Sequence, residues 1–563
     1  MSSGSAVTGG RAVVDALVAA GVDHAFTVPG ESFMGVLDAL VDEPRIRVIA
    51  TRHEGGAAFM AAAYARISGR PAVCMGTRMV GAANMAIGIH TARHDSVPVI
   101  AIAGQVTTGA RHREAFQEVE LAEVFGPFTK WSVEPPRADR LGELTYRAAR
   151  LARSGRPGPV LIALREDLLD VEVPGRDWPA IATPRPSADP DAVARTLALL
   201  SSAERPLLLL GGGVIAAGAT DACVALAETL GLPVVTMLRR PDAFPNDDPH
   251  YAGMTGNWAP PCVLEALLAA DVIVALGTRL NEFATYHYKV PAPTTRLVHV
   301  DLDDDALGGH VTAEIGCVSD ARSFAEALLA AARAKPIAKD RRAAWLERTR
   351  ALHTQWDRDT TPARRGGARA SYVDQQAVTW HLRKLLPRDA ILTSDAGNFG
   401  GWPHRYLHWN VPGTFLAPTN GAMGYGVPAA IAAKLARPER KVVAFVGDGG
   451  FLMTGTEIET AVREETPFVT IVYDNQQYGT IRMQQELEHP GRPMATALGP
   501  VDVAAFARSL GAHGISVRRD DDFPAAFEEA LRSDRPTVIH VPIDPQQISV
   551  NADRAATATA VAT

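Results

Sequence analysis

The sequence predicts an α/β protein built from three consecutive doubly wound parallel-sheet domains. Apolar, β-branched runs such as residues 442–446 (VVAFV) show no polar alternation, which is typical of strands buried on both faces of a parallel sheet. These runs alternate with helical segments along most of the chain, as a parallel sheet requires. With 563 residues the chain is also too long for one hydrophobic core.

Composition limits the class of protein further. The hydrophobic share of 47% and the charged share of 21% are those of a globular protein, and a net charge of −7 gives no attraction to nucleic acid or acidic membranes. The four cysteines have no C-x-x-C spacing, which predicts reduced thiols. The N-terminus has no signal-peptide pattern, and no uncharged apolar run reaches about 18 residues. We therefore expect a cytoplasmic protein without nucleic-acid or membrane partners.

The first predicted domain spans residues 1–175, and a proline-rich stretch closes it. Strands and helices alternate within it, which favours a doubly wound unit. Its expected elements are helix 10–20, strand 23–28, a helix ending at residue 40, strand 47–50, an alanine-rich helix ending at residue 66, and strands 71–75 and 97–103.

A second domain is predicted over residues 188–335, followed by a charged linker over residues 336–371. The sequence of the linker predicts one amphipathic helix, 342–355, and an exposed loop through residues 360–367. The expected strands of the second domain are 207–210, 233–237, 272–276 and 297–300.

The third domain is predicted over residues 372–550. The low-complexity residues 551–563 are expected to form a flexible tail. The expected elements of the third domain are strand 390–393, strand 442–446, a glycine turn at 447–450, a helix from about residue 454 to 465, and strand 468–473.

Polar residues follow two successive strands of the third domain. Asp448 lies in the turn Gly-Asp-Gly-Gly after the first strand, and Asn475 follows the second. In parallel α/β sheets both lie at the edge where ligands bind. Carboxylate, amide and main-chain oxygens suit Mg²⁺, and glycine N–H groups at a helix start suit a phosphate. An ordinary βαβ unit with a glycine turn is the alternative interpretation.

The Gly-Asp-Gly turn, followed by a helix and a strand and closed by Asn475, resembles the thiamine diphosphate motif. The resemblance implies that Asp448, Asn475 and the Gln477 carbonyl hold Mg²⁺, which holds the cofactor's diphosphate. One departure is Asp474, where the family often has asparagine. With the motif in the last of three domains, the chain resembles the pyruvate oxidase and acetolactate synthase branch. The cofactor-binding glycines of the turn are Gly447, Gly449 and Gly450.

Glu54 stands where a first-domain strand meets the alanine-rich helix. The resemblance implies that it hydrogen-bonds the aminopyrimidine and promotes the tautomer that deprotonates the thiazolium carbon, which requires a carboxyl able to exchange a proton. The alternative is an acid that merely favours a helix dipole. The resemblance also implies that Met423 wedges beneath the cofactor and that the Gly421 carbonyl accepts a hydrogen bond from the cofactor's amino group. Asn398 is implied to contact the cofactor's diphosphate. A core-filling role is the alternative for Met423.

The substrate pocket is expected in loops of the first domain, around Gly30 and Ser32 among others. Phe116 and Gln117 resemble a Phe-Gln-Glu stretch of acetolactate synthases whose side chains face the active site; a solvated helix start is the alternative. Met79 and Val80 replace an expected Gly-Pro and would reshape the cavity. Arg78 is expected either to pair with a carboxylate or to be a surface charge. The pocket residues are Gly30, Ser32, Arg78, Met79, Phe116 and Gln117, with Gln117 also a catalytic candidate.

The resemblance implies decarboxylation of a pyruvate-like 2-oxo acid and carboligation of the resulting enamine to an acceptor carbonyl. No two histidines are adjacent in the sequence, and a site poor in proton donors favours ligation. The alternatives are a decarboxylase that releases an aldehyde and, less favoured, an inactive regulatory subunit. The family assembles its site between chains, which implies a homodimer at least and commonly a homotetramer.

Gly211-Gly-Gly-Val-Ile-Ala216 in the second domain formally fits a dinucleotide fingerprint. Met237 is followed by Leu-Arg-Arg instead of an acidic residue, so NAD is not expected. In acetolactate synthases this domain holds a non-redox FAD, against a segment like residues 276–279. The next residues are Leu-Asn-Glu-Phe where relatives have Phe-Asp-Asp-Arg. The resemblance therefore leaves FAD open.

Overall fold

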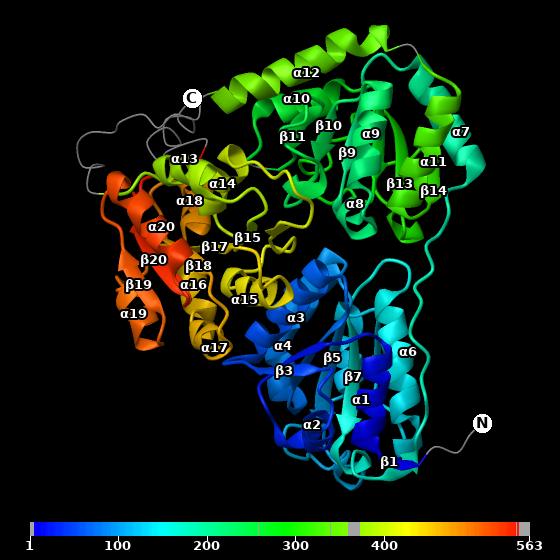
Figure 1. The fold of residues 1–563 in the computed structure, drawn as a ribbon, viewed down its shortest axis with the longest axis vertical. Helices are drawn as coiled ribbons and strands as arrows, with labels where there is room; N and C mark the ends of the chain where they lie inside the picture. The colour runs from blue at the N-terminus through cyan, green and yellow to red at the C-terminus, as the bar shows by residue number, and fades with distance from the viewer. Residues whose placement is uncertain (1–4, 257, 338, 359–371, 548, 551–563) are drawn as a thin grey trace.

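The computed structural model describes residues 5–256, 258–337, 339–358, 372–547 and 549–550 (Figure 1). Each of the three predicted domains contains a parallel six-stranded sheet, which confirms the fold class. The loop 360–367 and the tail 551–563 lie outside the described residues. Among the helices that the structure describes, none combines the length and apolar character needed to cross a membrane.

The first sheet has the strand order β3-β2-β4-β5-β7-β6. α1, α2 and α6 cover one face, while α3 and α4 cover the other. A short antiparallel pair joins β1 (Ala6–Thr8) to β8 (Glu172–Pro174). The strands are β2 (His24–Thr27), β3 (Arg47–Ala50), β4 (Ala72–Gly76), β5 (Val99–Gln105), β6 (Trp131–Val133) and β7 (Val160–Arg165); the helices are α1 (Gly9–Ala19), α2 (Met34–Val41), α3 (Glu54–Ser68), α4 (Arg78–Asp95), α5 (Leu121–Phe125) and α6 (Leu141–Arg153).

The central sheet has the order β11-β10-β9-β12-β13-β14. The linker helix predicted over residues 342–355 is present as α12 (Asp340–Arg358) and lies along the central domain (Figure 1). Trp345 fixes it there by donating to the Pro206 carbonyl at 2.9 Å. The strands are β9 (Pro206–Leu210), β10 (Val234–Thr236), β11 (Tyr251–Met254), β12 (Val272–Leu276), β13 (Arg296–Asp301) and β14 (Ile315–Val318); the helices are α7 (Pro190–Ser202), α8 (Gly212–Ala217), α9 (Thr220–Leu230), α10 (Pro261–Ala269) and α11 (Ala321–Ala334).

The third sheet has the order β16-β15-β17-β18-β20-β19. Its strands are β15 (Ile391–Ser394), β16 (Phe415–Leu416), β17 (Val442–Gly447), β18 (Val469–Asp474), β19 (His513–Ser516) and β20 (Thr537–Pro542); the helices are α13 (Gln375–Leu385), α14 (Gly401–Tyr406), α15 (Gly426–Ala436), α16 (Asp448–Thr454), α17 (Glu457–Arg463), α18 (Gly479–Glu488), α19 (Val503–Ser509) and α20 (Phe523–Arg532).

The first and third domains share one hydrophobic core. α3 packs against α15, and the buried alanines of both helices belong to the same cluster (Figure 1). Small side chains on both surfaces allow the two helices to lie close together. Residues 447–450 and the loop before Glu54 therefore belong to two domains that are packed directly on each other.

One expected element is wrong in its bounds. The prediction placed a turn at residues 447–450 and a helix over 454–465, but α16 begins at Asp448 and a second helix, α17, begins at Glu457. The glycines at 449 and 450 thus lie inside a helix. Glycine has a low helix propensity, so the helix over these residues depends on tertiary packing that overrides the propensity.

Candidate active site

Asp448 and Asn475 lie together at one sheet edge, as the sequence predicts. β17 and β18 are neighbouring parallel strands in which Gly447 lies opposite Tyr473, so Asp448 emerges beside the Asp474–Asn475 turn. Burial, together with the nearby Asp474 carboxyl, raises the pKa of Asp448 to about 7. Its Oδ2 is buried and has no hydrogen-bond partner. A bound cation would satisfy this oxygen, so the site fits Mg²⁺.

The loop after β18 is held in a fixed conformation. Gln476 has a φ of +55°, and Asn475 Oδ1 accepts the Gln477 N–H at 3.3 Å. The Gln477 side chain donates to the Pro545 carbonyl at 2.8 Å. Across the described ranges no cluster of three or more His, Cys, Asp or Glu side chains forms a metal site. A cation here would therefore depend on the Asn475 amide and on a main-chain carbonyl as well as on Asp448.

The glycines of α16 are required by close neighbours. A Cβ on Gly450 would lie 2.2 Å from Asp395 Oδ2, and one on Gly449 would lie 2.6 Å from the Tyr478 ring. Asp395 is buried and accepts the N–H groups of Gly424 and Gly426 at 2.9 and 2.5 Å. The start of α16 is thereby packed against the segment that carries Met423.

We expect Gly450→Ala to destabilise the protein by about 1–3 kcal/mol, because the added methyl group displaces the Asp395 carboxylate. Gly499→Ala is the matched control in the same domain, since a Cβ there meets no atom within 4 Å. Urea unfolding of the two variants measures the difference. Equal stability of the two would contradict the close packing described at Gly450.

Asn398 follows β15, at the start of the 3-10 turn Asn398–Gly400, and contacts the first two turns of α18. Its Oδ1 accepts the Thr480 hydroxyl at 3.2 Å, and its Nδ2 lies 3.5 Å from the Met483 sulfur. Thr480 is thus a neighbour of a predicted cofactor-binding residue that the sequence did not indicate; its position just after Gly479, in the first turn of α18, is the signal that could have pointed to it.

The segment that carries Gly421 and Met423 is exposed on one side. Gly421 has a φ of +74° with open space beside it. Met423 is half-buried and lies outside the described core clusters, whereas its neighbours Ala422 and Tyr425 belong to one. This placement favours the predicted role beneath the cofactor over core filling.

Glu54 begins α3, and its carboxylate is oriented by α4. Asn84 Nδ2 donates to Glu54 Oε2 at 2.9 Å. The preceding loop is fixed to the third domain, because the buried Glu457 carboxylate accepts the N–H groups of Arg52 and His53 at 3.1 Å. In the hydrogen bonds of the described residues, Glu54 has no link to Asp448. The two predicted site residues thus lie on α3 of the first domain and α16 of the third domain.

Arg78 pairs with carboxylates of the chain itself and is not a free surface charge. Its buried guanidinium lies 3.0 Å from Glu31 and 3.1 Å from Glu166, and 5.9 Å from the centre of the Phe116 ring. Ser32 Oγ lies 2.6 Å from Thr77 Oγ1 in the same region.

The remaining predicted pocket positions differ in exposure. A Cβ on Gly30 would lie 2.6 Å from Thr77 Cβ, so this turn is tightly packed. Met79 is half-buried against the shared core, whereas Val80 is 49% exposed. Of the two residues that replace Gly-Pro, Val80 is therefore the one that faces outward.

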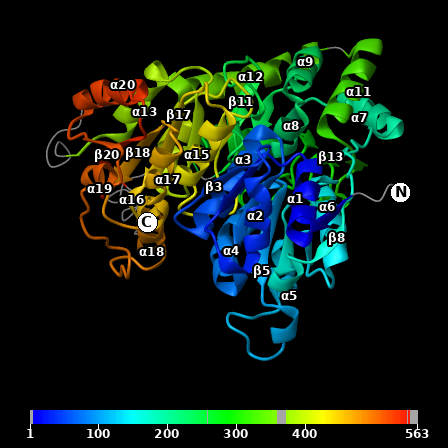
Figure 2. The same ribbon diagram turned by 60° about the horizontal axis from the view of Figure 1, so that its bottom comes forward.

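Phe116 and Gln117 lie on a loop, residues 106–120, that projects beside α5 (Figure 2). The alternative of a helix start is wrong: Gln117 has a φ of +63° and lies outside any helix. Arg111, with 8% of its side chain exposed, fixes the loop through ion pairs with Glu118, Glu120 and Glu134 at 2.8, 2.7 and 3.3 Å. Phe116 is 71% exposed.

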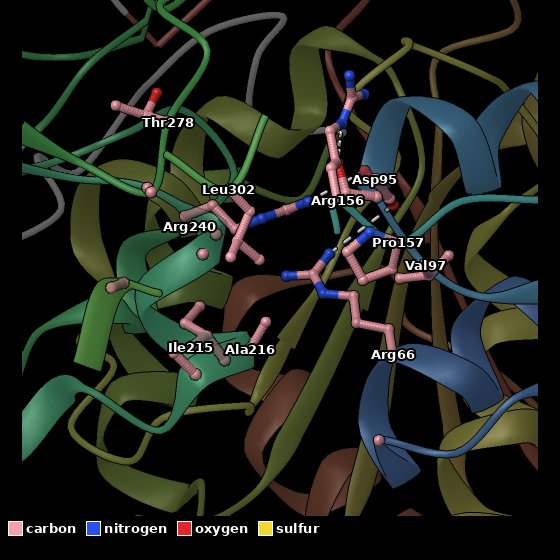
Figure 3. Close-up of a pocket in the computed structure, with 18 of the residues that line it drawn as sticks. Arg66, Asp95, Val97, Arg156, Pro157, Ile215, Ala216, Arg240, Thr278 and Leu302 are labelled. Atoms are coloured by element: carbon pink, nitrogen blue, oxygen red, sulfur yellow. Dashed lines mark hydrogen bonds and ion pairs between the residues drawn. The ribbon is translucent and has the colours of Figure 1, made fainter. Parts of the chain in front are cut away.

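A cavity of about 740 Å³ lies between the three domains, at the carboxyl edge of the central sheet (Figure 3). Its lining includes the glycines predicted for a dinucleotide, residues 211–213, and the predicted segment from Gly277 to Arg279. Arg66 and Arg240 line it from different domains, and Arg66 Nη1 is buried without a hydrogen-bond partner. Arg240 is hydrogen-bonded to Asp95, so the Arg66 guanidinium, which lies 3.8 Å from that carboxylate, is the cation that fits a ligand carrying phosphate.

The chain belongs to the thiamine pyrophosphate enzyme family. Its residues 7–124, 193–328 and 395–541 match, in turn, the N-terminal TPP binding domain, the central domain and the C-terminal TPP binding domain of that family.

Similar proteins of known name cover almost the whole chain. It is 34% identical to the probable acetolactate synthase large subunit of Methanocaldococcus jannaschii, over 96% of this chain and 92% of that protein. It is 35% identical to the acetolactate synthase large subunit of Parasynechococcus marenigrum, over 95% and 87% of the two chains. For the acetolactate synthase large subunit of Corynebacterium glutamicum the identity is 32%, over 95% and 86%.

Proposed function

We propose that this protein uses thiamine diphosphate and Mg²⁺ to decarboxylate a 2-oxo acid and to join the remaining fragment to a second carbonyl compound. The observation that carries the proposal is the buried Asp448 carboxylate, whose Oδ2 lacks a partner at the sheet edge shared with Asn475. A divalent cation with an attached diphosphate is the ligand that best satisfies this arrangement.

Separate residues of the chain would hold the cation, the diphosphate and the pyrimidine of the cofactor. Asp448, Asn475 and the Gln477 carbonyl hold the cation, and Asn398 orients the diphosphate. When bound, the cofactor supplies a thiazolium ring as electron sink for loss of CO₂. Glu54 exchanges a proton with the pyrimidine, and Asn84, which donates to Glu54 at 2.9 Å, keeps the carboxylate in place.

Ligation is favoured over aldehyde release because no two histidines are adjacent in the sequence, so the chain lacks the histidine pair that could protonate the enamine. His112, on the loop that carries Gln117, has 77% of its side chain exposed and lies 3.8 Å from Glu120. His53 uses its Nδ1 to accept the Gly55 N–H at 2.9 Å. A site poor in proton donors favours attack on a second carbonyl over protonation.

The test is the product formed with pyruvate, and separately with bulkier 2-oxo acids, in the presence of Mg²⁺ and thiamine diphosphate. We expect CO₂ together with a hydroxyketone or hydroxy-oxo acid. His112→Ala is expected to leave the product ratio unchanged, since His112 faces solvent. Aldehyde as the main product would overturn ligation and establish the decarboxylase alternative.

We also propose a homodimer as the smallest active unit, with a homotetramer as the common assembly. The support is that Glu54 and Asn84 lie on a surface that exposes Val80 and Ile87. A second copy placed there would bring Asp448 to Glu54 and cover these apolar side chains. Analytical ultracentrifugation tests the assembly.

FAD is the ligand that we propose for the central cavity. The support is its volume of about 740 Å³, the glycines 211–213 that let a ligand approach the backbone, and the arginines of its wall. A yellow protein that releases flavin on denaturation would establish this; a colourless protein that takes up no added FAD would overturn it.

A further inference from the structure

The segment before Gly421 is fixed to the first domain by one buried carboxylate. Asp95, the last residue of α4, accepts the Thr419 N–H at 3.1 Å and the Thr419 hydroxyl at 2.6 Å through the same oxygen, Oδ1. The Asp95 side chain is only 2% exposed. Charge-assisted bonds of this kind are stronger than neutral ones, so they hold the backbone of the segment firmly.

Two arginines of the central cavity pair with the same carboxylate. Arg240 Nη2 lies 3.0 Å from Asp95 Oδ1, and Arg66 Nη1 lies 3.8 Å from Oδ2 (Figure 3). Burial alone would raise the pKa of Asp95, but the two guanidinium groups hold it below its ordinary value. Asp95 therefore stays ionised between the cavity wall and Thr419.

Neighbouring contacts fix the same stretch of chain. The buried Arg239 donates to the Pro418 carbonyl, and Asn420 Nδ2 donates to Thr91 Oγ1 at 3.1 Å. Residues 418–420 are thus held from α4 and from the central domain, directly before the two residues predicted to contact the cofactor.

We propose that Asp95 is a positioning residue for thiamine diphosphate. Through Thr419 it sets the place of the Gly421 carbonyl and the Met423 side chain, although Asp95 itself lies at the cavity wall. The inference rests on the proposed function, in which these two residues contact the cofactor. A segment that is no longer fixed must be ordered when the cofactor binds, and this ordering lowers affinity.

The experiment measures thiamine diphosphate binding to the full chain by calorimetry at saturating Mg²⁺. We expect Thr419→Val to weaken the Kd about tenfold, because it removes a hydrogen bond to a charged group. Thr419→Ser, which keeps the hydroxyl, should stay within about threefold of the wild type on the same argument. Asp95→Asn, which removes the charge but keeps an oxygen acceptor, should weaken binding too. Combining it with Thr419→Val should cost less than the sum of the two single effects, because both changes weaken the same contact.

Thr196→Val is the control, since this buried threonine donates within α7 to the Ala192 carbonyl at 2.7 Å, away from the segment. The melting temperature without cofactor should fall no further in Thr419→Val than in the control. An unchanged Kd in Thr419→Val, or equal weakening in the control, would overturn the proposal. If the variants bind thiamine diphosphate as expected but the wild type turns over no 2-oxo acid, the proposed reaction is overturned and the role of Asp95 stands. If the wild type does not bind thiamine diphosphate, both proposals are overturned.

Discussion

Glu54→Gln is expected to reduce kcat by about 10²–10⁴-fold while thiamine diphosphate still binds. The glutamine side chain has the same shape and can still accept the Asn84 amide, which lies 2.9 Å from Oε2 in the wild type. It cannot exchange a proton with the pyrimidine. Steady-state turnover of a 2-oxo acid measures the loss, and calorimetry with thiamine diphosphate measures the binding.

Glu143→Gln is the matched control, because Glu143 is an acid in the first turn of α6 just as Glu54 is in α3. If Glu54 served only the helix dipole, both changes would cost about 0.3–1 kcal/mol of stability and leave turnover intact. Turnover of Glu54→Gln within about tenfold of the wild type would contradict the catalytic role, because loss of acid–base catalysis should reduce kcat by at least about 10²-fold.

The sequence predicts the strands well wherever both faces of a sheet are covered. The strand expected over residues 272–276 has those bounds in β12, because a buried parallel strand must be apolar at every position. The placement of Asp448 beside Asn475 follows from the same topology, since successive parallel strands end at one edge. These features depend on local pattern and on a general rule of sheet geometry.

The contacts that shape the site could not be predicted, because they join distant parts of the chain. Glu457 accepts the N–H groups of Arg52 and His53, and Asp95 accepts the N–H and the hydroxyl of Thr419. Each acid nevertheless looks like an ordinary helical residue in the sequence. The helix start at Asp448 was missed for the same reason. Its glycines are explained by Asp395 and Tyr478, which no local pattern indicates.

Asp448→Asn is expected to weaken Mg²⁺ binding by about 100-fold or more, since loss of a charged ligand should cost at least as much as loss of a group that only orients one. Thiamine diphosphate binding, which depends on the cation, should fall with it. The cofactor-free variant should nevertheless melt no lower than the wild type at pH 8. Burial raises the pKa of Asp448 from 3.8 to about 7, so this carboxyl lowers stability progressively as the pH rises from the first value to the second, and the loss is complete at pH 8; the neutral amide avoids it.

Asp474→Asn is the control that separates direct coordination of Mg²⁺ by Asp448 from general electrostatic attraction at this edge. Asp474 lies at the same edge, but its carboxylate is paired with buried His540 at 2.8 Å, and it is not among the predicted ligands. Calorimetry with Mg²⁺ should therefore show a loss of no more than about tenfold, the lower end of the range for a neighbouring group. Equal losses in the two variants would mean that the edge attracts the cation only through its summed charge. A large loss confined to Asp448→Asn would identify the Asp448 carboxylate as a direct ligand.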